Sequence, residues 1–442
     1  MNATDTHARP LEPSSSPRVP IVHESVAAIA AWCVLVAVAA GWGAVLLARG
    51  ANFSSLDAPP LTGHLRPHAG PWLALPAGLA VLAIWLLPRA AVRIRWKSLL
   101  VLMPSAAFVW AMSLALAGGA HALVRPLLSS SDYLHDLGRV GNPVSFLHHF
   151  VRDIGSYTTH VRAHPPGMLL VLWSLRRAGL AGAWPAAFLV IASGAASVSA
   201  VLVSIREVAG EQAARRGAPF LAIAPAAIWI ATSADALFAG VSAWGVALVI
   251  LASGRTGARA RAYALAGGVL FGAALMLSYG LVPLAAVPLA VALRRGRAGL
   301  LVLSAAGMFA VLGLFWALGF SWVAGLLAAR REYNAYITRL RPYDYFLLAN
   351  VAAFAIALGP AITRGLSSLR DRGIWLLVAG ALVAVAAADL SGLSKGEVER
   401  IWLPFVPWVL AATAAIQVRA RRWLAAQAIV ALAITLLVRS PW

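Results

Sequence analysis

Residues 26–48 read VAAIAAWCVLVAVAAGWGAVLLA, an apolar run without a charged side chain. A helix of about 20 apolar residues crosses the hydrocarbon core of a bilayer, so this run is long enough to span it. The run is also too long for the apolar part of a signal peptide, which covers about 7–15 residues. We therefore expect it to be retained as a membrane span.

The composition of the whole chain agrees with this reading. Of its 442 residues, 61% are hydrophobic and only 12% are charged, and the mean hydropathy is +0.80. A soluble protein of this length needs a charged surface that this chain lacks, so most of it must face lipid. The expected fold class is all-α, a polytopic membrane protein. The single cysteine, Cys33, excludes an intramolecular disulfide.

The net charge of +20 is gathered in short arginine-rich linkers, which is typical of cytoplasmic loops and not of a nucleic-acid-binding patch. The basic linkers are 89–97, 254–262, 294–297, 364–372 and 419–422. The predicted spans are 26–48, 72–88, 98–120, 183–205, 217–234, 235–253, 262–278, 280–293, 298–325, 346–363, 374–390, 401–417 and 423–438. With the linkers inside, the N-terminus is cytoplasmic and thirteen spans put the C-terminus outside. Residues 1–25, polar and rich in Pro and Ser, are expected to be a disordered cytoplasmic tail.

This count requires that residues 164–182 do not cross the membrane. Arg176 and Arg177 interrupt that segment, and burying them in the bilayer centre would be costly. An interfacial helix with its arginines among the lipid headgroups fits better. The alternative is a true span here and a miscounted neighbour.

The same count places the remaining polar segments together on the outer face. They are loop 49–71, loop 121–182, the turns around Asp235 and Tyr279, loop 326–345 and loop 391–400. The arginine-rich, lysine-poor and alanine-rich composition suggests a bacterial genome of high GC content. We therefore expect a bacterial plasma (inner) membrane protein whose active site faces outward.

Two candidate groups lie in loop 121–182. SSSDYLHDLGRVGN (129–142) holds Asp132, Tyr133 and Asp136 just beyond a span. Asp132 could act as a general base or bind a metal, or could simply be a solvated or helix-capping carboxylate. In YTTHVRAHPPGMLL (157–170), two prolines fix the entry into the next helix and hold His164 rigidly beside the membrane. A helix start with an incidental histidine is the alternative.

Two more groups lie at later turns. Asp235 sits between two apolar spans, where a carboxylate either has a function or belongs to a helix cap after Ser233. SKGEVERIWLPFVPW (394–408) holds one of the two lysines of the chain, Lys395, near Arg400. These cations could hold a phosphate. Alternatively they form salt bridges at helical spacing, Lys395 with Glu399 and Glu397 with Arg400.

A weaker group alternates arginine with tyrosine at residues 329–346. Such a pattern is typical of an interfacial anchoring belt, and it could also line a sugar or phospholipid site. Its members are Arg330, Arg331, Tyr333, Tyr336, Arg339, Arg341, Tyr343 and Tyr345.

In this order the motifs resemble the GT-C superfamily of glycosyltransferases, polytopic enzymes that take a sugar from a polyprenyl-phosphate carrier. The chain looks most like the protein O-mannosyltransferase and lipid A aminoarabinose transferase branches. Asp132-Tyr133 matches their acidic loop opening and His164-Pro165-Pro166-Gly167 their His-Pro-Pro-Leu motif, while Asp235 matches a later Asp and Ser278-Tyr279 a Lys-Tyr turn. The resemblance covers about 98–293, with a looser likeness beyond.

The resemblance implies a division of the chain and a set of roles. Residues 26–97 would be two additional N-terminal spans before a catalytic transmembrane domain, 98–438. Asp132 would deprotonate or orient an acceptor hydroxyl, and direct displacement would invert the anomeric carbon. The implied donor is a polyprenyl-phosphate sugar and the acceptor a glycan, lipid or protein. Residues expected to bind substrate are Tyr133, Asp136, His164, Asp235, Tyr279, Lys395, Glu397 and Arg400.

The chain also departs from the pattern of that superfamily. Asp132 is followed by Tyr and not Glu, which leaves the divalent cation of the family uncertain as a cofactor. Gly167 replaces Leu, and Ser278 stands where Lys is common, so Lys395 and Arg400 would supply the phosphate partners. Two other classes remain open: a transporter or flippase of a lipid-linked substrate, against which the lack of an internal repeat counts, and a non-catalytic envelope-assembly protein.

Overall fold

The computed structural model describes residues 21–441, apart from 54–56, 69, 232 and 336–339 and the side chains of 21–25. Residues 1–20, most of the predicted disordered tail, lie outside the described residues. The structure is 78% helical and all-α. Its one sheet, within the described part, is a two-residue antiparallel pair of β1 (His64–Leu65) and β2 (Val438–Arg439). The predicted all-α class is confirmed.

Eight helices of the described chain are long and apolar enough to cross a membrane, which supports the prediction of a polytopic membrane protein. Each coincides with a predicted span, because an uninterrupted apolar run is a local signal for a membrane helix. They are α1 (Ile21–Ala48), α2 (Ala74–Arg93), α3 (Trp96–Leu116), α8 (Ala183–Ala209), α11 (Ala234–Ser253), α14 (Ala298–Ala317), α18 (Arg372–Leu390) and α21 (Ala420–Leu437).

Four of the remaining five predicted spans are shorter or broken, while 262–278 lies in one continuous 19-residue helix, so the thirteen spans of the sequence prediction are not all long straight helices. Residues 346–363 form α16 (Tyr343–Leu358) and α17 (Ala361–Ser368), bent by 93° at Gly359-Pro360, and this pair could count as a ninth span. The other four regions form α9 (Glu211–Ala222) with α10 (Ala227–Ile230), α12 (Gly257–Leu275), η6 (Tyr279–Ala285) with α13 (Ala286–Arg294), and α19 (Val398–Ile401) with α20 (Val406–Leu410) and η8 (Ala411–Ala415). Prolines interrupt the apolar helices in four of these five regions.

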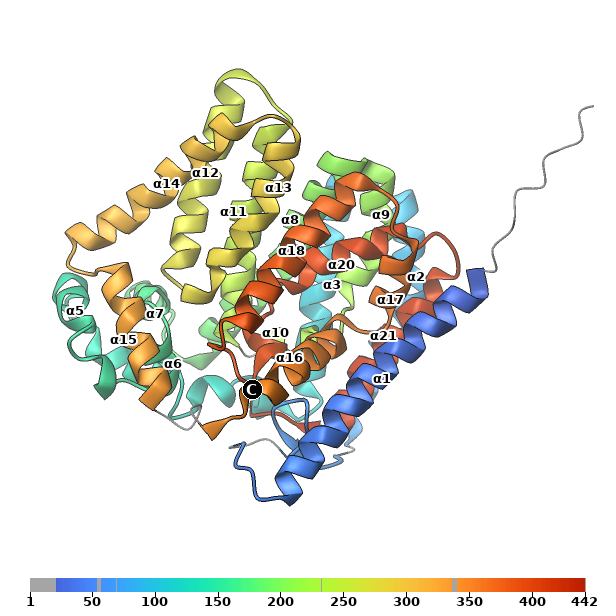
Figure 1. Ribbon diagram of the computed structural model, residues 1–442, viewed down its shortest axis with the longest axis horizontal. Helices are drawn as coiled ribbons and strands as arrows, with labels where there is room; N and C mark the ends of the chain where they lie inside the picture. Colours follow the sequence, from blue (N-terminus) through green and yellow to red (C-terminus); the bar gives the residue numbers. More distant parts are fainter. Residues whose placement is uncertain (1–20, 54–56, 69, 232, 336–339, 442) are drawn as a thin grey trace, which may run out of the picture.

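Short helices fill the long loop 121–182 and gather with α15 (Trp322–Ala335) at one end of the bundle, the lower end in Figure 1. They are η2 (Ala120–Leu123), η3 (Pro126–Leu128), α4 (Tyr133–Asp136), η4 (Leu137–Arg139), α5 (Pro143–Phe150), η5 (Ile154–Ser156), α6 (Thr159–Ala163) and α7 (Gly167–Arg177); a further 3-10 turn, η1 (Pro71–Leu73), precedes α2. Helix α7 has 11 residues, roughly 16 Å at 1.5 Å per residue, and is too short to cross a bilayer.

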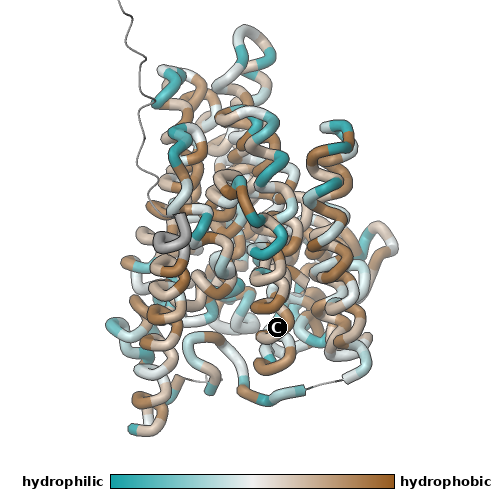
Figure 2. Tube along the Cα trace, turned by 90° about the vertical axis from the view of Figure 1, so that its right-hand side faces the viewer, coloured by the Kyte–Doolittle hydropathy of each residue, from teal (hydrophilic) through white to brown (hydrophobic). Residues whose placement is uncertain are grey.

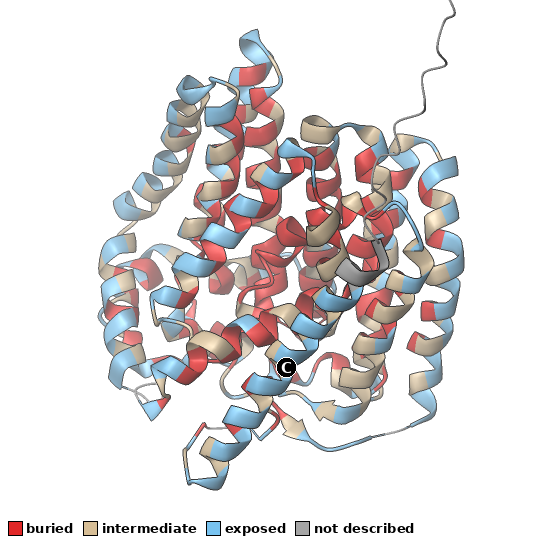
Figure 3. Cartoon of the chain, turned by 45° about the vertical axis from the view of Figure 1, so that its right-hand side comes forward, coloured by how far each residue is buried: buried red, intermediate tan, exposed pale blue. Residues whose placement is uncertain are grey.

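Close helix packing builds the centre of the bundle. A Cβ on Gly240 of α11 would collide with Ser193 of α8, and one on Gly268 of α12 would collide with Ser304 of α14. Small residues let membrane helices approach this closely. Figure 3 shows the buried residues in the middle of the bundle and the exposed ones around it. Large apolar side chains on the outside, such as Trp316, fit a lipid-facing surface.

The two additional N-terminal spans are not a separate layer. Trp32 of α1 donates a hydrogen bond from Nε1 to the carbonyl of Ala355 in α16, at 2.9 Å. Helix α2 packs on α21 and α3. Figure 2 shows hydrophobic residues along the helix bodies and hydrophilic ones at many of the turns. The loop after α1 reaches the lower end of the bundle, where the polar groups described next are gathered.

Candidate functional site

Asp132 begins helix α4. Its Oδ1 accepts a hydrogen bond from the backbone N–H of Tyr133 at 2.7 Å, so the carboxylate is a helix N-cap, one of the alternatives that the sequence left open. Its other oxygen, Oδ2, lies 3.0 Å from Nδ1 of His160. Both side chains are mostly buried, with 6% and 14% exposed respectively. The cap therefore also belongs to a buried carboxylate–imidazole pair.

His160 is held in place by its own backbone. Its N–H donates to the carbonyl of Ser131 at 3.1 Å, which ties α6 to the residue before Asp132. The second ring nitrogen, Nε2, lies 3.4 Å from Nη2 of Arg400. His160 thus connects Asp132 to Arg400, which lies 240 positions after His160 in the sequence.

Asp235 and Arg400 form the second half of the arrangement. Arg400 Nη1 lies 2.7 Å from Asp235 Oδ2, with 7% and 3% of the side chains exposed. Ser233 Oγ donates to the same carboxylate oxygen at 2.6 Å and accepts from the Asp235 N–H at 3.1 Å, so the predicted cap after Ser233 is also present. A buried ion pair of this kind holds its partners in one geometry because separating them would leave a charge uncompensated.

Arg400 has a second carboxylate partner. Its Nη2 donates to Glu397 Oε2 at 2.7 Å, which is the pair predicted from i, i+3 spacing. Burial lowers the pKa of Arg400, but Asp235 and Glu397 outweigh it and raise that pKa above its ordinary value. Burial raises the pKa of Glu397, but the nearby Arg400 and Arg341 outweigh this effect and hold that pKa below its ordinary value. Both groups are therefore held charged.

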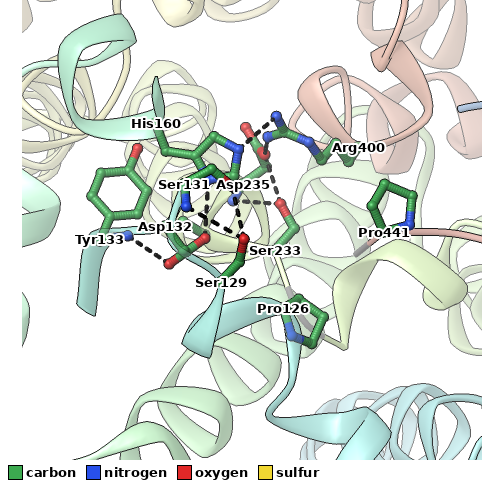
Figure 4. Close-up of a pocket in the computed structure, with 11 residues that line it drawn as sticks. Pro126, Ser129, Ser131, Asp132, Tyr133, His160, Ser233, Asp235, Arg400 and Pro441 are labelled. Carbon is green, nitrogen blue, oxygen red and sulfur yellow. Dashed lines mark hydrogen bonds and ion pairs between the residues drawn. The ribbon is translucent and has the colours of Figure 1, made fainter. Parts of the chain in front are cut away.

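These side chains line one small cavity, of about 40 Å³. Figure 4 shows Asp132, His160, Asp235 and Arg400 pointing toward one another. Such a volume holds on the order of three water molecules at roughly 10–15 Å³ each. It admits a reacting hydroxyl or phosphate oxygen in this conformation, and a whole sugar ring would have to widen it. The remaining lining residues are Pro126, Ser129, Ser131, Tyr133, Ser233, Ala234 and Pro441.

Tyr133 lines the cavity, and His164 lies next to Tyr133 outside the lining. The Tyr133 ring centroid is 6.1 Å from those of His160 and His164. Burial raises the pKa of the Tyr133 hydroxyl well above its ordinary value, and no described residue accepts its proton. His164 Nδ1 is 2.9 Å from the His160 carbonyl, and burial lowers the pKa of the His164 ring. The His-Pro-Pro corner thus supports the backbone of His160.

The structure explains why glycine stands at position 167, where the motif that this segment resembles has Leu. Its N–H donates to the Met276 carbonyl at 2.9 Å, and a Cβ at this position would collide with that same carbonyl oxygen. The close approach joins the start of α7 to the end of α12. Only glycine fits here without displacing one of the two backbones.

Three other predicted site residues lie away from the cavity lining. Asp136 Oδ2 accepts from the Thr158 N–H at 2.7 Å on the other side of α4. Tyr279 packs on Trp322, with ring centroids 5.3 Å apart, and burial raises the pKa of its hydroxyl. Lys395 contributes backbone contacts: its N–H donates to Tyr333 Oη at 3.2 Å and its carbonyl accepts from Arg341.

Of the arginine and tyrosine group, Arg341 enters the region around the site. Its Nη2 lies 3.6 Å from Glu397, and 6% of its side chain is exposed. Tyr345 stacks on Phe53 at 5.1 Å, and the Tyr343 hydroxyl donates to the Leu390 carbonyl. The group therefore holds loops together as well as lying at a helix end. Tyr336 and Arg339 lie outside the described residues, while Arg330 and Arg331 belong to α15.

Sequence reasoning singled out neither His160 nor Glu399 as a site residue. His160 precedes His164 by four residues, a spacing that puts both near one helix face, and this signal could have found it. Glu399 is fully buried, and its Oε1 accepts from the Thr62 N–H at 2.9 Å. No sequence pattern links those two positions. Among the described residues, no three His, Cys, Asp or Glu side chains are grouped so as to hold a metal ion.

Comparison with known proteins adds no assignment, since no family model, curated protein or solved structure matches the chain.

Proposed function

We propose that the chain is a membrane glycosyltransferase of GT-C type that moves a sugar from a polyprenyl-phosphate donor to an acceptor outside the cytoplasm. One observation carries the proposal: Asp132, His160, Arg400 and Asp235 meet in one buried cavity at the end of the helix bundle. Of these four, Asp132 and Asp235 were expected from the motif order of such enzymes, and Arg400 was expected as a phosphate partner in place of the missing Lys. A cavity with a base candidate beside a buried guanidinium suits transfer from a phosphate leaving group.

In this proposal Asp132 is the general base. The acceptor hydroxyl gives its proton to the Asp132–His160 pair while its oxygen attacks the anomeric carbon of the donor. The bond from that carbon to the phosphate oxygen breaks, and the polyprenyl phosphate leaves with the bonding electrons. Attack opposite to the leaving group inverts the anomeric configuration. His160 orients Asp132 through the 3.0 Å contact and shares the proton.

Arg400 would stabilise the negative charge that grows on the leaving phosphate. Two carboxylates already partner its guanidinium, so a phosphate must take the place of one of them. Glu397 is the more exposed partner, at 22% against 3% for Asp235, and it would move away. Arg341, which lies on the other side of Glu397, and Lys395 would then help to hold the phosphate.

The proposal includes the setting of the reaction. A bacterial plasma membrane would carry the chain, with loop 121–182 and the cavity facing outward, where a lipid-linked donor is available. Residues 98–438 would form the catalytic domain, and α1 and α2 would support it from the side. The proposed chemistry takes its positive charge from the Arg400 guanidinium, which lines the cavity, and includes no step on a divalent cation.

The proposal is tested by transfer activity in lipid. The purified protein is given radiolabelled polyprenyl-phosphate sugars and a crude envelope acceptor fraction. Wild type is compared with Asp132→Asn, and Asp344→Asn is the matched control because Asp344 is an exposed helix-start carboxylate. Transfer should be lost in Asp132→Asn by at least 10²-fold, the lower end for general-base catalysis, and kept in the control.

Two results would contradict the proposal. If Asp132→Asn transfers as well as wild type, Asp132 is not the base. If wild type moves a fluorescent polyprenyl-phosphate sugar across the bilayer without transferring the sugar, the chain is a flippase.

A further inference from the structure

An open polar groove lies along α4, α5 and the 3-10 turns η4 and η5. It consists of two hollows of about 360 Å³ each, which share Arg139, Ser156 and Tyr157. One hollow extends to Ser130, His135, Asp136 and Thr158, and the other to Asn142, Ser145, His149 and Asp153. Each hollow falls within the roughly 300–1,000 Å³ of small-molecule sites. We call this feature the outer groove.

The outer groove and the buried cavity share a wall. Ser130 lines the groove, and the next two residues, Ser131 and Asp132, line the cavity. Likewise Thr158 lines the groove and His160 the cavity. Thr158 Oγ1 donates to the Asp132 carbonyl at 3.5 Å, which joins the two segments of the wall. A ligand in the groove therefore lies one backbone thickness from the proposed base.

The groove offers both hydrogen-bond donors and hydrogen-bond acceptors to a ligand. Arg139 Nη1 donates to the Ser156 carbonyl and hydroxyl, both at 3.0 Å, and the guanidinium lies 4.6 Å from the Tyr157 ring centroid. Within the described part of the chain, nothing accepts from its Nε or Nη2. Asp136 Oδ1 is 3.8 Å from Arg139 Nη1, too far for a hydrogen bond, so this oxygen can also accept from a ligand.

We infer that the outer groove binds the acceptor, and that this acceptor is a polyhydroxylated glycan chain. The inference rests on the proposed function and adds the substrate class. A sugar hydroxyl both donates and accepts hydrogen bonds, and the lining of the groove offers both donors and acceptors. The charges of Arg139 and Asp136 in this lining offset each other. A lipid chain would find little apolar surface in the groove. A peptide strand would find no sheet edge, because helices and 3-10 turns form the walls.

The test measures binding separately from transfer. Full-length protein in lipid nanodiscs is titrated with maltohexaose, mannohexaose and hexagalacturonate, and separately with a Ser/Thr-rich dodecapeptide, with saturation-transfer NMR as the readout. At least one hexasaccharide should bind to wild type. Arg139→Gln should weaken that binding by about tenfold, as expected for a lost charge-assisted hydrogen bond. Arg66→Gln, at an exposed arginine of another loop, should leave it unchanged.

His135→Ala provides a second variant, since His135 is exposed in the groove and its loss should not affect folding. Weaker binding in both groove variants supports the inference. Binding of the peptide alone, of no hexasaccharide, or of hexasaccharide equally in all variants overturns it. If Asp132→Asn loses transfer while no hexasaccharide binds, the enzyme assignment stands and the groove assignment fails. If a hexasaccharide binds but wild type transfers no sugar, the groove assignment stands and the enzyme assignment fails.

Discussion

Thr62 and Glu399 are 337 positions apart in sequence, and the Thr62 N–H donates to Glu399 Oε1 at 2.9 Å. In return, Thr62 Oγ1 accepts from the Glu397 N–H at 3.1 Å. Glu397 has a left-handed backbone, with φ of 63°, which is strained for a residue with a side chain. The loop between α1 and α2 therefore holds the strained turn that carries Glu397 and precedes Arg400, so this N-terminal loop contributes directly to the candidate site.

Thr62→Val should loosen this turn, because valine has the shape of threonine without the hydroxyl. The lost hydrogen bond contributes about 0.5–1.5 kcal/mol, so we expect transfer activity to fall several-fold through misplacement of Arg400. Thr62→Ser keeps the oxygen and should keep most of the activity. Measured in lipid, equal activity of the Val and Ser variants would contradict a positioning role for the Thr62 hydroxyl.

The buried carboxyl group of Glu399 should make the stability of the folded protein depend on pH. Burial raises its pKa from 4.5 to about 7, and the residue lies outside the long membrane helices. Between these two values the folded protein binds a proton that the unfolded chain has released, so stability falls as pH rises from about 4.5 to about 7. The full change is on the order of 3 kcal/mol at about 1.36 kcal/mol per pKa unit.

Thermal unfolding of the protein in lipid at pH 5 and pH 7.5 checks this prediction. Glu399→Gln should flatten the difference between the two melting temperatures, because glutamine does not titrate. Asp344→Asn, at an exposed carboxylate, should leave the difference as in wild type. A Glu399→Gln variant with an unchanged pH difference would show that other groups cause it.

His160→Gln should separate the role of the ring from that of Asp132. Glutamine can donate one hydrogen bond to Asp132 but cannot take up a proton, so we expect transfer to fall by about 10²-fold or more and the pH profile to change shape. Donor KM should change little, since Arg400 and Asp235 remain paired. A pH profile identical to wild type, merely scaled down, would indicate a structural role for His160.

Gly167→Ala tests the close approach of α7 and α12. The added Cβ meets the Met276 carbonyl, so we expect destabilisation of about 1–3 kcal/mol, as is usual for overpacking. Gly78→Ala is the matched control, because nothing lies within 4 Å of a Cβ at this helical glycine. Melting temperatures in lipid compare the two, and a Gly167→Ala variant as stable as Gly78→Ala would disprove the steric argument.

Ser145→Cys, in a Cys33→Ala background, tests the orientation of loop 121–182. Ser145 is exposed in α5, so an impermeant thiol reagent should label it in intact cells. Labelling only after lysis would put the loop and the candidate site on the cytoplasmic side and contradict the proposed topology.

The extent of agreement between sequence and structure differs from region to region. The span 298–325 and helix α14 agree because twenty apolar residues are enough to specify a membrane helix. The span 217–234 is instead the end of α9 followed by α10, separated at residues 223–226, where Pro225 lacks the N–H that a continuous helix needs. For Glu397 and Arg400, helical spacing predicted the pair that the structure contains, although Glu397 precedes α19 with a left-handed backbone and is not part of that helix.

The sequence by itself determined the membrane character, the long helices and the gathering of the polar loops at one end. Hydropathy is a local property of each stretch of chain, and successive spans place every second loop on the same side of the membrane. Only the tertiary structure decided that His160 joins Asp132 to Arg400, that Asp235 pairs with Arg400, and that Thr62 holds the turn before Arg400. These contacts join segments far apart in the chain. They depend on how neighbouring helices pack, to within a fraction of an ångström, and no single stretch of sequence encodes that packing.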